Sequence, residues 1–316
     1  MTESKPLTHR LDRWLRRNEP YQSLNLSQAH IEKLLRNKKI LVNGQKATAS
    51  TRVTDQDEIS LAQGFDLETL AIPERQPIDA VRPIRYTNED LDFLKTLIVW
   101  EDDDLCVLNK PAGLAVQGGT GTRYHLDGLL QFYGKGQPFR LVHRLDKDTS
   151  GVFVVAKTLQ KAVELAQAFK DHRVEKVYWA FVEGIPNPPF GSIDVAVAKE
   201  LGQGYEKVVV DKKEGKPALT DYRLIKAFVD RQGAWLELSP KTGRTHQLRV
   251  HCSYKGHPIW GDMKYGSKVK ETLCLHARQL TIPDSESGRS LTFTAPPPAH
   301  MDDILKRNKV DWQKYC

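Results

Sequence analysis

Apolar residues near the N-terminus repeat at the three- and four-residue spacing of a helix over two short stretches. The two helix faces are Leu11, Trp14, Leu15 and Ile31, Leu34, Leu35. The next segment, KILVNGQKATAS, sets Asn43-Gly44, a strong tight-turn signal, between extended stretches, and EISL supplies a later strand. The pattern predicts a small α/β domain over residues 1–62, in the order helix, helix and hairpin.

Farther along the chain the pattern changes twice. Residues 63–97 contain prolines, several charges and little periodicity, which predicts a linker between domains with room for one strand. From residue 98 apolar and polar residues alternate as in strands, apart from one helical stripe behind Thr158. We therefore expect an α+β fold with a mixed, largely antiparallel sheet and a few helices over residues 98–300. A tail with one short surface helix follows at residues 301–316.

Positive charge is concentrated in the predicted small domain. The 316-residue chain has a formal net charge of +7, and between His9 and Arg52 there are ten Lys or Arg residues against three Asp or Glu residues. Such an excess favours a polyanionic partner, although a merely solvated basic surface is the alternative. The basic positions that avoid the apolar helix faces are Arg13, Arg16, Arg17, Lys33, Arg36, Lys38 and Lys39.

Cysteine usage and hydropathy indicate the compartment. The four cysteines are scattered, without a C-x-x-C pair or a disulfide spacing, which disfavours a structural zinc and an oxidised framework. The first thirty residues lack the apolar run of a signal peptide, and no stretch approaches the ~20 apolar residues that span a bilayer. We expect a cytoplasmic protein without a membrane partner.

The densest cluster of functional residue types is LVHRLDKDTSGVFVVAKT, where charged and hydroxyl side chains crowd between two apolar, strand-like runs. Asp146 stands at the end of the first run, before a turn that ends in Gly151, so a rigid support could hold its carboxylate in a cleft. A single Asp in a turn is more often structural than catalytic. The residues alone leave both roles open for Asp146.

The second cluster is PKTGRTHQLRVHCSYKGHPIWGDMKYG, in which polar and cationic residues lead into a predicted helix. Free backbone N–H groups and the helix dipole make such a helix start suitable for an anion. The histidines do not have metal-ligand spacing, since His246 and His251 are five residues apart and His257 follows in a Gly-Pro turn. We expect no bound metal.

These segments resemble two known families. Residues Leu11 to Leu61 are similar to the S4 RNA-binding domain in the helix ending at Arg36, the ILVNG turn and the closing V-x-x-x-D-E-I run, although TDQD replaces the usual Gly-Asp step. The segments HRLDKDTSG, TGRTHQLRVH and GHPIWGDMKYG resemble signatures of the RluA-type pseudouridine synthases. NKPAGLAVQGG and the K-x-Y step at Lys176–Tyr178 extend this likeness over residues 98–296.

The second resemblance implies a set of site residues. Asp146 matches the essential aspartate, Arg249 the arginine that pairs with it, and Tyr178 the tyrosine that stacks on the target uracil, with strand packing as the alternative for the tyrosine. A bidentate contact between Arg249 and Asp146 would orient the carboxylate. The residues expected to bind RNA or shape the pocket are Arg144, His143, Leu248, Arg244, Thr245, His246 and Lys110.

The implied reaction isomerises uridine to pseudouridine, with the aspartate as a nucleophile on the sugar or as a base at C2′. Because no redox change and no outside group donor are involved, we expect no cofactor, nucleotide cofactors included. The segments NKPAGLAVQGGTG and EGKPALTDYRL favour the subgroup that acts on large-subunit ribosomal RNA, and nothing requires more than a monomer.

Two other classes of protein compete with this interpretation. A non-catalytic RNA-binding or ribosome-assembly protein would carry a damaged HRLD segment, whereas here that segment is intact. A glycosidase or nuclease needs two opposed carboxylates or a metal cluster. Asp146 and Asp148 lie on one turn, which disfavours an acid and base pair.

Overall fold

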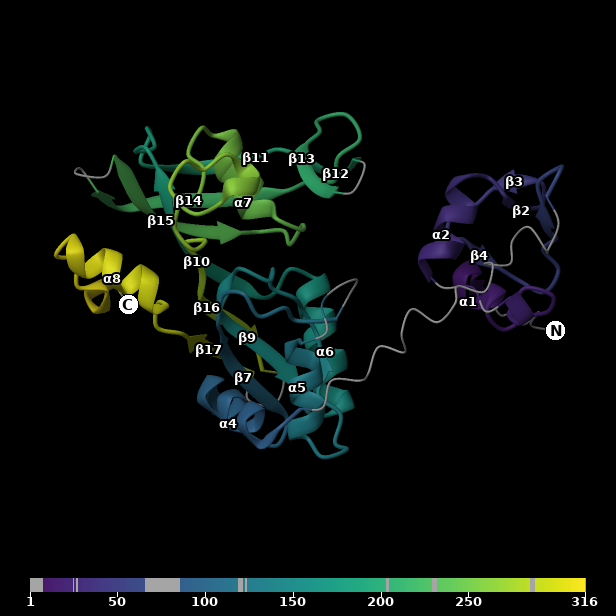
Figure 1. The fold of residues 1–316 in the computed structure, drawn as a ribbon, viewed down its shortest axis with the longest axis horizontal. Helices are drawn as coiled ribbons and strands as arrows, with labels where there is room; N and C mark the ends of the chain where they lie inside the picture. The colour runs from purple at the N-terminus through teal and green to yellow at the C-terminus, as the bar shows by residue number, and fades with distance from the viewer. Residues whose placement is uncertain are drawn as a thin grey trace. The chain divides into compact units, whose positions relative to one another are not determined.

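The structure, a computed structural model, describes residues 8–24, 26, 28–65, 86–118, 122, 124–202, 205–228, 232–284 and 288–315. The chain divides into two compact units, Met1–Pro83 and Ile84–Cys316 (Figure 1). Across these described ranges no helix has the length and apolar character that a membrane crossing needs.

The first unit is a small α/β domain. Its elements are β1 (His9–Arg10), α1 (Leu11–Leu15), η1 (Gln22–Leu24), α2 (Gln28–Arg36), β2 (Ile40–Val42), β3 (Gln45–Lys46), β4 (Arg52–Val53) and β5 (Ile59–Leu61). Strand β2 pairs antiparallel with β3 and β5, and β1 pairs with β4. Asn43 and Gly44 have φ of 51° and 72°, the left-handed geometry of a tight hairpin turn. The predicted order of helix, helix and hairpin is confirmed.

The core of this unit is formed by the two predicted helix faces. Leu11 and Leu15 of α1 and Ile31 and Leu35 of α2 are buried together. Lys39 is half-buried, with Nζ 4.3 Å from the centre of the Phe65 ring. The other predicted basic residues are exposed: Arg13, Arg16, Arg17, Lys33, Arg36 and Lys38. Their charges are accessible to a partner, and RNA contact by them stays a prediction.

The second unit is organised around a ten-stranded sheet. The elements up to the sheet centre are α4 (Asn88–Leu97), β6 (Ile98–Glu101), β7 (Leu105–Lys110), α5 (Leu126–Tyr133), β8 (Arg140–Leu141), β9 (Ser150–Ala156), α6 (Leu159–Lys170) and β10 (Glu175–Glu183). Those that follow are β11 (Phe190–Asp194), β12 (Val197–Gly202), β13 (Tyr205–Val210), β14 (Leu219–Phe228), β15 (Gly233–Pro240), α7 (Gln247–Tyr254), η3 (Met263–Tyr265), β16 (Leu275–Pro283), β17 (Ser290–Thr294), α8 (Ala299–Arg307) and η4 (Trp312–Tyr315).

The sheet is mixed and largely antiparallel, as predicted. Its order is β11-β14-β15-β10-β16-β9-β7-β6, with β17 added to β16 and β8 to β9. The pair β9–β16 is parallel, while the pairs on either side of it, β10–β16 and β7–β9, are antiparallel. Strands β12 and β13 form a separate hairpin.

Helices cover both faces of the β9–β7–β6 end of the sheet (Figure 1). Because successive strand residues point to opposite faces, α4 and α5 pack on the face that carries Leu108 and Phe153, and α6 packs on the face that carries Val107 and Val154. At the other end, α7 and α8 pack against β10 and β15 in one core. Both halves of the sheet therefore have their own apolar core.

Two segments differ from the sequence prediction. Residues 88–97, predicted as linker, form α4, which starts with a capping box between Thr87 and Asp90 and buries Leu94 against the sheet. The tail after residue 300 is not a surface element, because Met301 and Ile304 of α8 are fully buried in the core. Charged residues around these few apolar positions obscured the helical pattern in both places.

Two backbone features at the centre of the sheet affect how β9, β10 and β16 are positioned. The β10–β16 register shifts between Val177 and Tyr178, a bulge of the kind that re-aims a side chain. On β9, Gly151 has φ of 113°, and a Cβ there would lie 2.2 Å from the carbonyl oxygen of Ala277. Only glycine lets β9 and β16 approach this closely, so the start of β9, directly after the loop that carries Asp146, is held against β16.

Candidate active site

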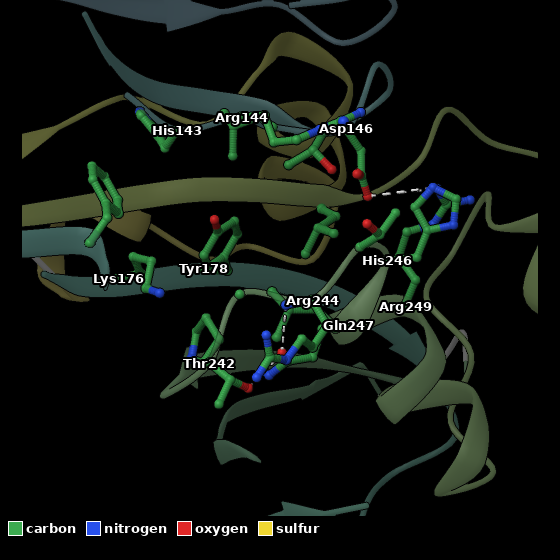
Figure 2. Close-up of a pocket in the computed structure, with 18 of the residues that line it drawn as sticks. His143, Arg144, Asp146, Lys176, Tyr178, Thr242, Arg244, His246, Gln247 and Arg249 are labelled. Atoms are coloured by element: carbon green, nitrogen blue, oxygen red, sulfur yellow. Dashed lines mark hydrogen bonds and ion pairs between the residues drawn. The ribbon is translucent and has the colours of Figure 1, made fainter. Parts of the chain in front are cut away.

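A cavity of about 480 Å³ opens between the loop that precedes β9 and the segment that leads into α7 (Figure 2). The loop contributes Arg144 and Asp146, and β10 contributes Lys176 and Tyr178. The volume of the cavity lies within the range of ~300–1,000 Å³ that is usual for ligand sites. Segments far apart in the sequence therefore converge on one hollow.

Asp146 directs one carboxylate oxygen at two nitrogen groups. Its Oδ2 lies 3.8 Å from Nε2 of His246 and 3.9 Å from Nη1 of Arg249. The first of these contacts is drawn as a dashed line in Figure 2. The same oxygen therefore lies within ion-pair distance of both groups.

Arg249 is held mainly by a different carboxylate from the one predicted. Its Nε and Nη2 donate to the two oxygens of Asp262 at 2.7 and 2.8 Å, and both side chains are buried. The predicted bidentate contact with Asp146 is therefore wrong, because Asp262 takes it. Burial lowers the pKa of Arg249, but the hydrogen bonds and charge of Asp262 outweigh this and raise it. The guanidinium stays charged and fixed, with Nη1 turned toward Asp146.

His246 is oriented by a buried tyrosine. Its Nδ1 lies 2.7 Å from the hydroxyl oxygen of Tyr265, which also accepts a hydrogen bond from the backbone N–H of Val208 at 3.1 Å. We assign the hydroxyl of Tyr265 as the donor to Nδ1, the direction in which it both accepts from Val208 and donates, and this assignment puts the ring proton on Nε2, the atom nearest Asp146. Burial lowers the pKa of His246 although Asp146 opposes the effect, so the ring is neutral near pH 7.

Tyr178 forms a wall of the cavity opposite the loop that carries Asp146 (Figure 2). Burial first, and then the negative charge of Asp146, raise the pKa of its hydroxyl group. Burial also lowers the pKa of the neighbouring Lys176. Leu248 and Leu275 add apolar surface to the same cavity. The ring of Tyr178 and these leucines form a surface on which a flat base can pack.

The segment leading into α7 is fixed by Gln247. Its Oε1 accepts hydrogen bonds from the Thr242 hydroxyl at 2.7 Å and from the backbone N–H of Arg244 at 3.0 Å. Its Nε2 donates to the carbonyl of Leu219 and the hydroxyl of Thr220. Three predicted residues are thereby presented to the cavity: Arg244, Thr245 and Leu248.

Lys110 does not belong to the cavity, contrary to the sequence prediction. Its side chain is fully buried, and Nζ donates to the carbonyl oxygens of Pro111, Leu114 and Lys147 at 2.8 to 3.0 Å. Burial lowers its pKa to about 8. An ammonium group enclosed by three carbonyls cannot touch RNA, and it instead ties the loop after β7 to the loop that carries Asp146.

His143 lines the cavity but its ring is already engaged. The imidazole is stacked between Phe153 and Phe169, with ring centres 4.5 and 4.7 Å away. Its Nε2 accepts a hydrogen bond from the backbone N–H of Val154. Burial lowers its pKa to about 3, so the ring is neutral at physiological pH. His143 supports the loop and offers RNA no charge.

Two residues that complete the site were missed by sequence reasoning. Asp262 and Tyr265 both belong to the GDMKYG segment, which follows α7 and packs back against it. The segment was noted for its resemblance, but nothing in it says which carboxylate Arg249 would choose. In the described ranges no group of three or more His, Cys, Asp or Glu side chains is placed to hold a metal ion.

Comparison with known proteins agrees with this geometry. Residues 104–254, which include Asp146, Tyr178 and Arg249, match the model of the RNA pseudouridylate synthase family, and residues 10–59 match the S4 domain. A ribosomal large subunit pseudouridine synthase C from Rickettsia bellii is 36% identical over 96% of this chain and 99% of that protein. The chain belongs to the RNA pseudouridine synthase family. It is an enzyme of this isomerase class, with an S4 domain at its N-terminus.

Other relatives extend the likeness. A protein of the same name from Vibrio cholerae is 31% identical to this pseudouridine synthase over 94% of this chain and 92% of that protein. The solved structure of human RNA pseudouridylate synthase domain containing 4 is 29% identical, covers 71% of this chain and 98% of that chain, and superposes with a TM-score of 0.60. The larger part of this chain therefore has the same fold as a solved RNA pseudouridylate synthase domain.

Proposed function

We propose that this pseudouridine synthase converts uridine to pseudouridine in large-subunit ribosomal RNA, with Asp146 as its essential carboxylate and without a cofactor. The proposal rests on the position of Asp146, which shares a cavity with Tyr178 and has Oδ2 3.9 Å from a charged arginine. The RNA is taken from the names of the Rickettsia and Vibrio relatives.

The isomerisation exchanges a nitrogen linkage for a carbon linkage. The N1–C1′ bond breaks, the C5–C1′ bond forms, and the proton lost from C5 is balanced by one gained at N1. Asp146 either attacks C1′ or removes a proton from C2′ to give a glycal. Both roles need an ionised carboxylate, and the charged guanidinium of Arg249 lies 3.9 Å from Oδ2 of Asp146. Since atoms balance without redox change or a group donor, no cofactor enters the reaction.

The detached uracil has to stay in place while it turns. A base reaches such a cavity only after it has left its stack in the RNA. Tyr178 offers it a π-face, and stacking of this kind is tolerant of a base that rotates in its own plane. Arg144, exposed at the edge of the same cavity, is placed to contact the RNA from which the nucleotide leaves.

The competing classes of protein fit this site less well. A glycosidase needs a second carboxylate across the substrate, and Asp262 cannot serve because it is buried with both oxygens bound to Arg249. A non-catalytic RNA-binding protein has no use for a carboxylate beside Tyr178. We also propose that the protein acts as a monomer, in the cytoplasm where its RNA would be.

Replacement of Asp146 tests the proposal. We expect Asp146→Asn to bind a large-subunit RNA transcript with wild-type affinity and to form no pseudouridine, measured by mass spectrometry of RNA digests. Asp171→Asn is the matched control, because it removes the same charge from the exposed end of α6, outside the cavity. Turnover of Asp146→Asn at a rate near that of the control would refute the proposal.

A further inference from the structure

A second cavity, of about 700 Å³, lies on the other side of Asp146. It shares Asp146, Arg144, His246 and Arg249 with the first cavity, but the rest of its lining is different. The catalytic carboxylate is therefore at the junction of two hollows. Only the first of them is used by the reaction as described above.

The second cavity is lined by loops whose described residues include no Phe, Tyr or Trp, and its one imidazole, that of His246, is shared with the first cavity. Its walls come from Ala112-Gly113 after β7, from Lys147-Asp148 in the loop that carries Asp146, and from Met263 and Lys264 after α7. The first cavity, in contrast, contains Tyr178 and the ring of Phe169. A nucleobase would find the rings of Tyr178 and Phe169 in the first cavity, and in the second only the His246 ring that both cavities share, among the described residues.

The charges of the second cavity suit a phosphate group. Asp262 is neutralised by its two hydrogen bonds to Arg249, and the three exposed cations Arg144, Lys147 and Lys264 outnumber the two remaining carboxylates, Asp146 and Asp148. An anion placed close to the Asp146 carboxylate needs such cations to offset the repulsion between like charges. Lysine and arginine on loops are the usual partners of phosphodiester oxygens.

Hydrogen bonds fix two of the loops that line the second cavity, the loop after β7 and the loop that carries Asp146. The buried ammonium of Lys110 donates to carbonyls on both sides, at Pro111 and Leu114 and at Lys147, and the backbone N–H of Gly113 also donates to the Lys147 carbonyl at 3.0 Å. These bonds fix the backbone from which the Lys147 side chain extends. Because this backbone is already fixed, binding of the ligand does not cost the conformational entropy of ordering it.

We propose that the second cavity binds the phosphodiester group that flanks the target uridine, with Lys147 and Lys264 as its cationic contacts. This inference rests on the proposed function: if the target ribose lies at Asp146 with its base against Tyr178, the adjoining backbone leaves through the hollow that begins at the same carboxylate. The site thereby sets how the target nucleotide is presented to Asp146.

RNA oligonucleotides with one uncharged linkage test this site. The probe is a short RNA around a uridine that the wild-type enzyme modifies, with a methylphosphonate placed immediately 5′ or 3′ of that uridine. For the wild-type enzyme we expect one of the two placements to raise KM about tenfold, the loss typical of a charge-assisted hydrogen bond. The side that responds identifies which flanking group occupies the cavity.

Variants connect the effect to the two lysines. Lys147→Gln and Lys264→Gln are each expected to raise KM for natural RNA about tenfold and to lower the salt slope of binding by about 0.7, the value for one single-strand phosphate contact. In these variants the uncharged linkage should cause little further loss. Lys268→Gln is the matched control, since Lys268 is equally exposed in the same segment but lines neither cavity.

The possible outcomes separate this inference from the proposed function. The second cavity does not hold the phosphodiester if the uncharged linkage raises KM for each lysine variant by the same factor as for the wild-type enzyme. The same conclusion follows if both lysine variants behave like Lys268→Gln. If Asp146→Asn is inactive in the same assays, the proposed function stands and only the cavity inference fails. Turnover by Asp146→Asn would instead overturn both.

Discussion

Arg249 binds Asp262 through two hydrogen bonds, at 2.7 and 2.8 Å, and turns its third nitrogen toward Asp146 at 3.9 Å. One guanidinium thus connects the buried carboxylate of Asp262 to the partly exposed carboxylate of Asp146, which we propose to be the reactive one. Because the Asp262 pair is removed from water, its geometry is rigid and its charge is not screened by solvent. The field at Asp146 therefore depends on Asp262.

Replacing Asp262 should damage both stability and catalysis. We expect Asp262→Asn to lower the free energy of unfolding by about 3 kcal/mol, because the buried guanidinium loses its partner. The catalytic rate should fall by more than about tenfold, since Arg249 is no longer held toward Asp146. Asp92→Asn, which breaks the exposed pair with Lys95, is the control and should leave both quantities near wild type. If Asp262→Asn unfolds at the same denaturant concentration as the wild-type protein, Asp262 is not the partner that stabilises Arg249.

Removing the Tyr265 hydroxyl should act through His246. Tyr265→Phe deletes the donor to Nδ1, so the proton is no longer confined to Nε2 beside Asp146, and we expect kcat to fall about tenfold. The effect should vanish in a His246→Gln background, where the donor has lost its target. Steady-state kinetics of the two single variants and the double variant measure this coupling. Additive losses would mean that Tyr265 acts independently of His246.

Lys110 should behave as a structural residue. Lys110→Met leaves three carbonyl groups without their donor, and we expect the free energy of unfolding to fall by about 2 kcal/mol or more. The salt slope of RNA binding should not change, because the ammonium is buried. A reduced slope with wild-type stability is the result that a direct RNA contact would give.

The lowered pKa of Lys110 also predicts a pH effect. The pKa is about 8 in the folded protein against an ordinary value of 10.5, so between these values the folded state holds fewer protons than the unfolded state. The contribution of Lys110 to the free energy of unfolding therefore increases as the pH rises from about 8 to 10.5. Denaturant titrations at pH 8 and pH 10 should show this rise in the wild-type enzyme and its loss in Lys110→Met.

The basic residues of the S4 domain should bind RNA without reading its sequence. We expect Lys33→Gln combined with Arg36→Gln, both exposed on α2, to weaken binding to different RNAs alike and to reduce the salt slope by about 1 to 2. Thermal unfolding should be unchanged. Lys255→Gln, at the exposed end of α7, is the control. An unaltered salt slope in the double variant would exclude this face from the RNA interface.

Local pattern alone determined much of this protein. The helix faces of the S4 domain and the Asn43-Gly44 turn follow from the spacing of apolar residues and from the backbone freedom of a turn, both of which act between neighbours in the chain. The segments around Asp146 and Arg249 were enough to indicate the family, because their resemblance to its signatures is carried by short runs of consecutive residues. These features were found where the sequence placed them.

The tertiary structure decided which of these side chains meet. Whether Arg249 pairs with Asp146 or with Asp262, and whether Lys110 reaches RNA or three buried carbonyls, depends on how distant segments pack. The burial of α4 and α8 was decided in the same way, since a few apolar residues form a core only when a sheet is present to cover. Burial and long-range contacts arise from the folded arrangement of many segments, so a linear pattern does not contain them.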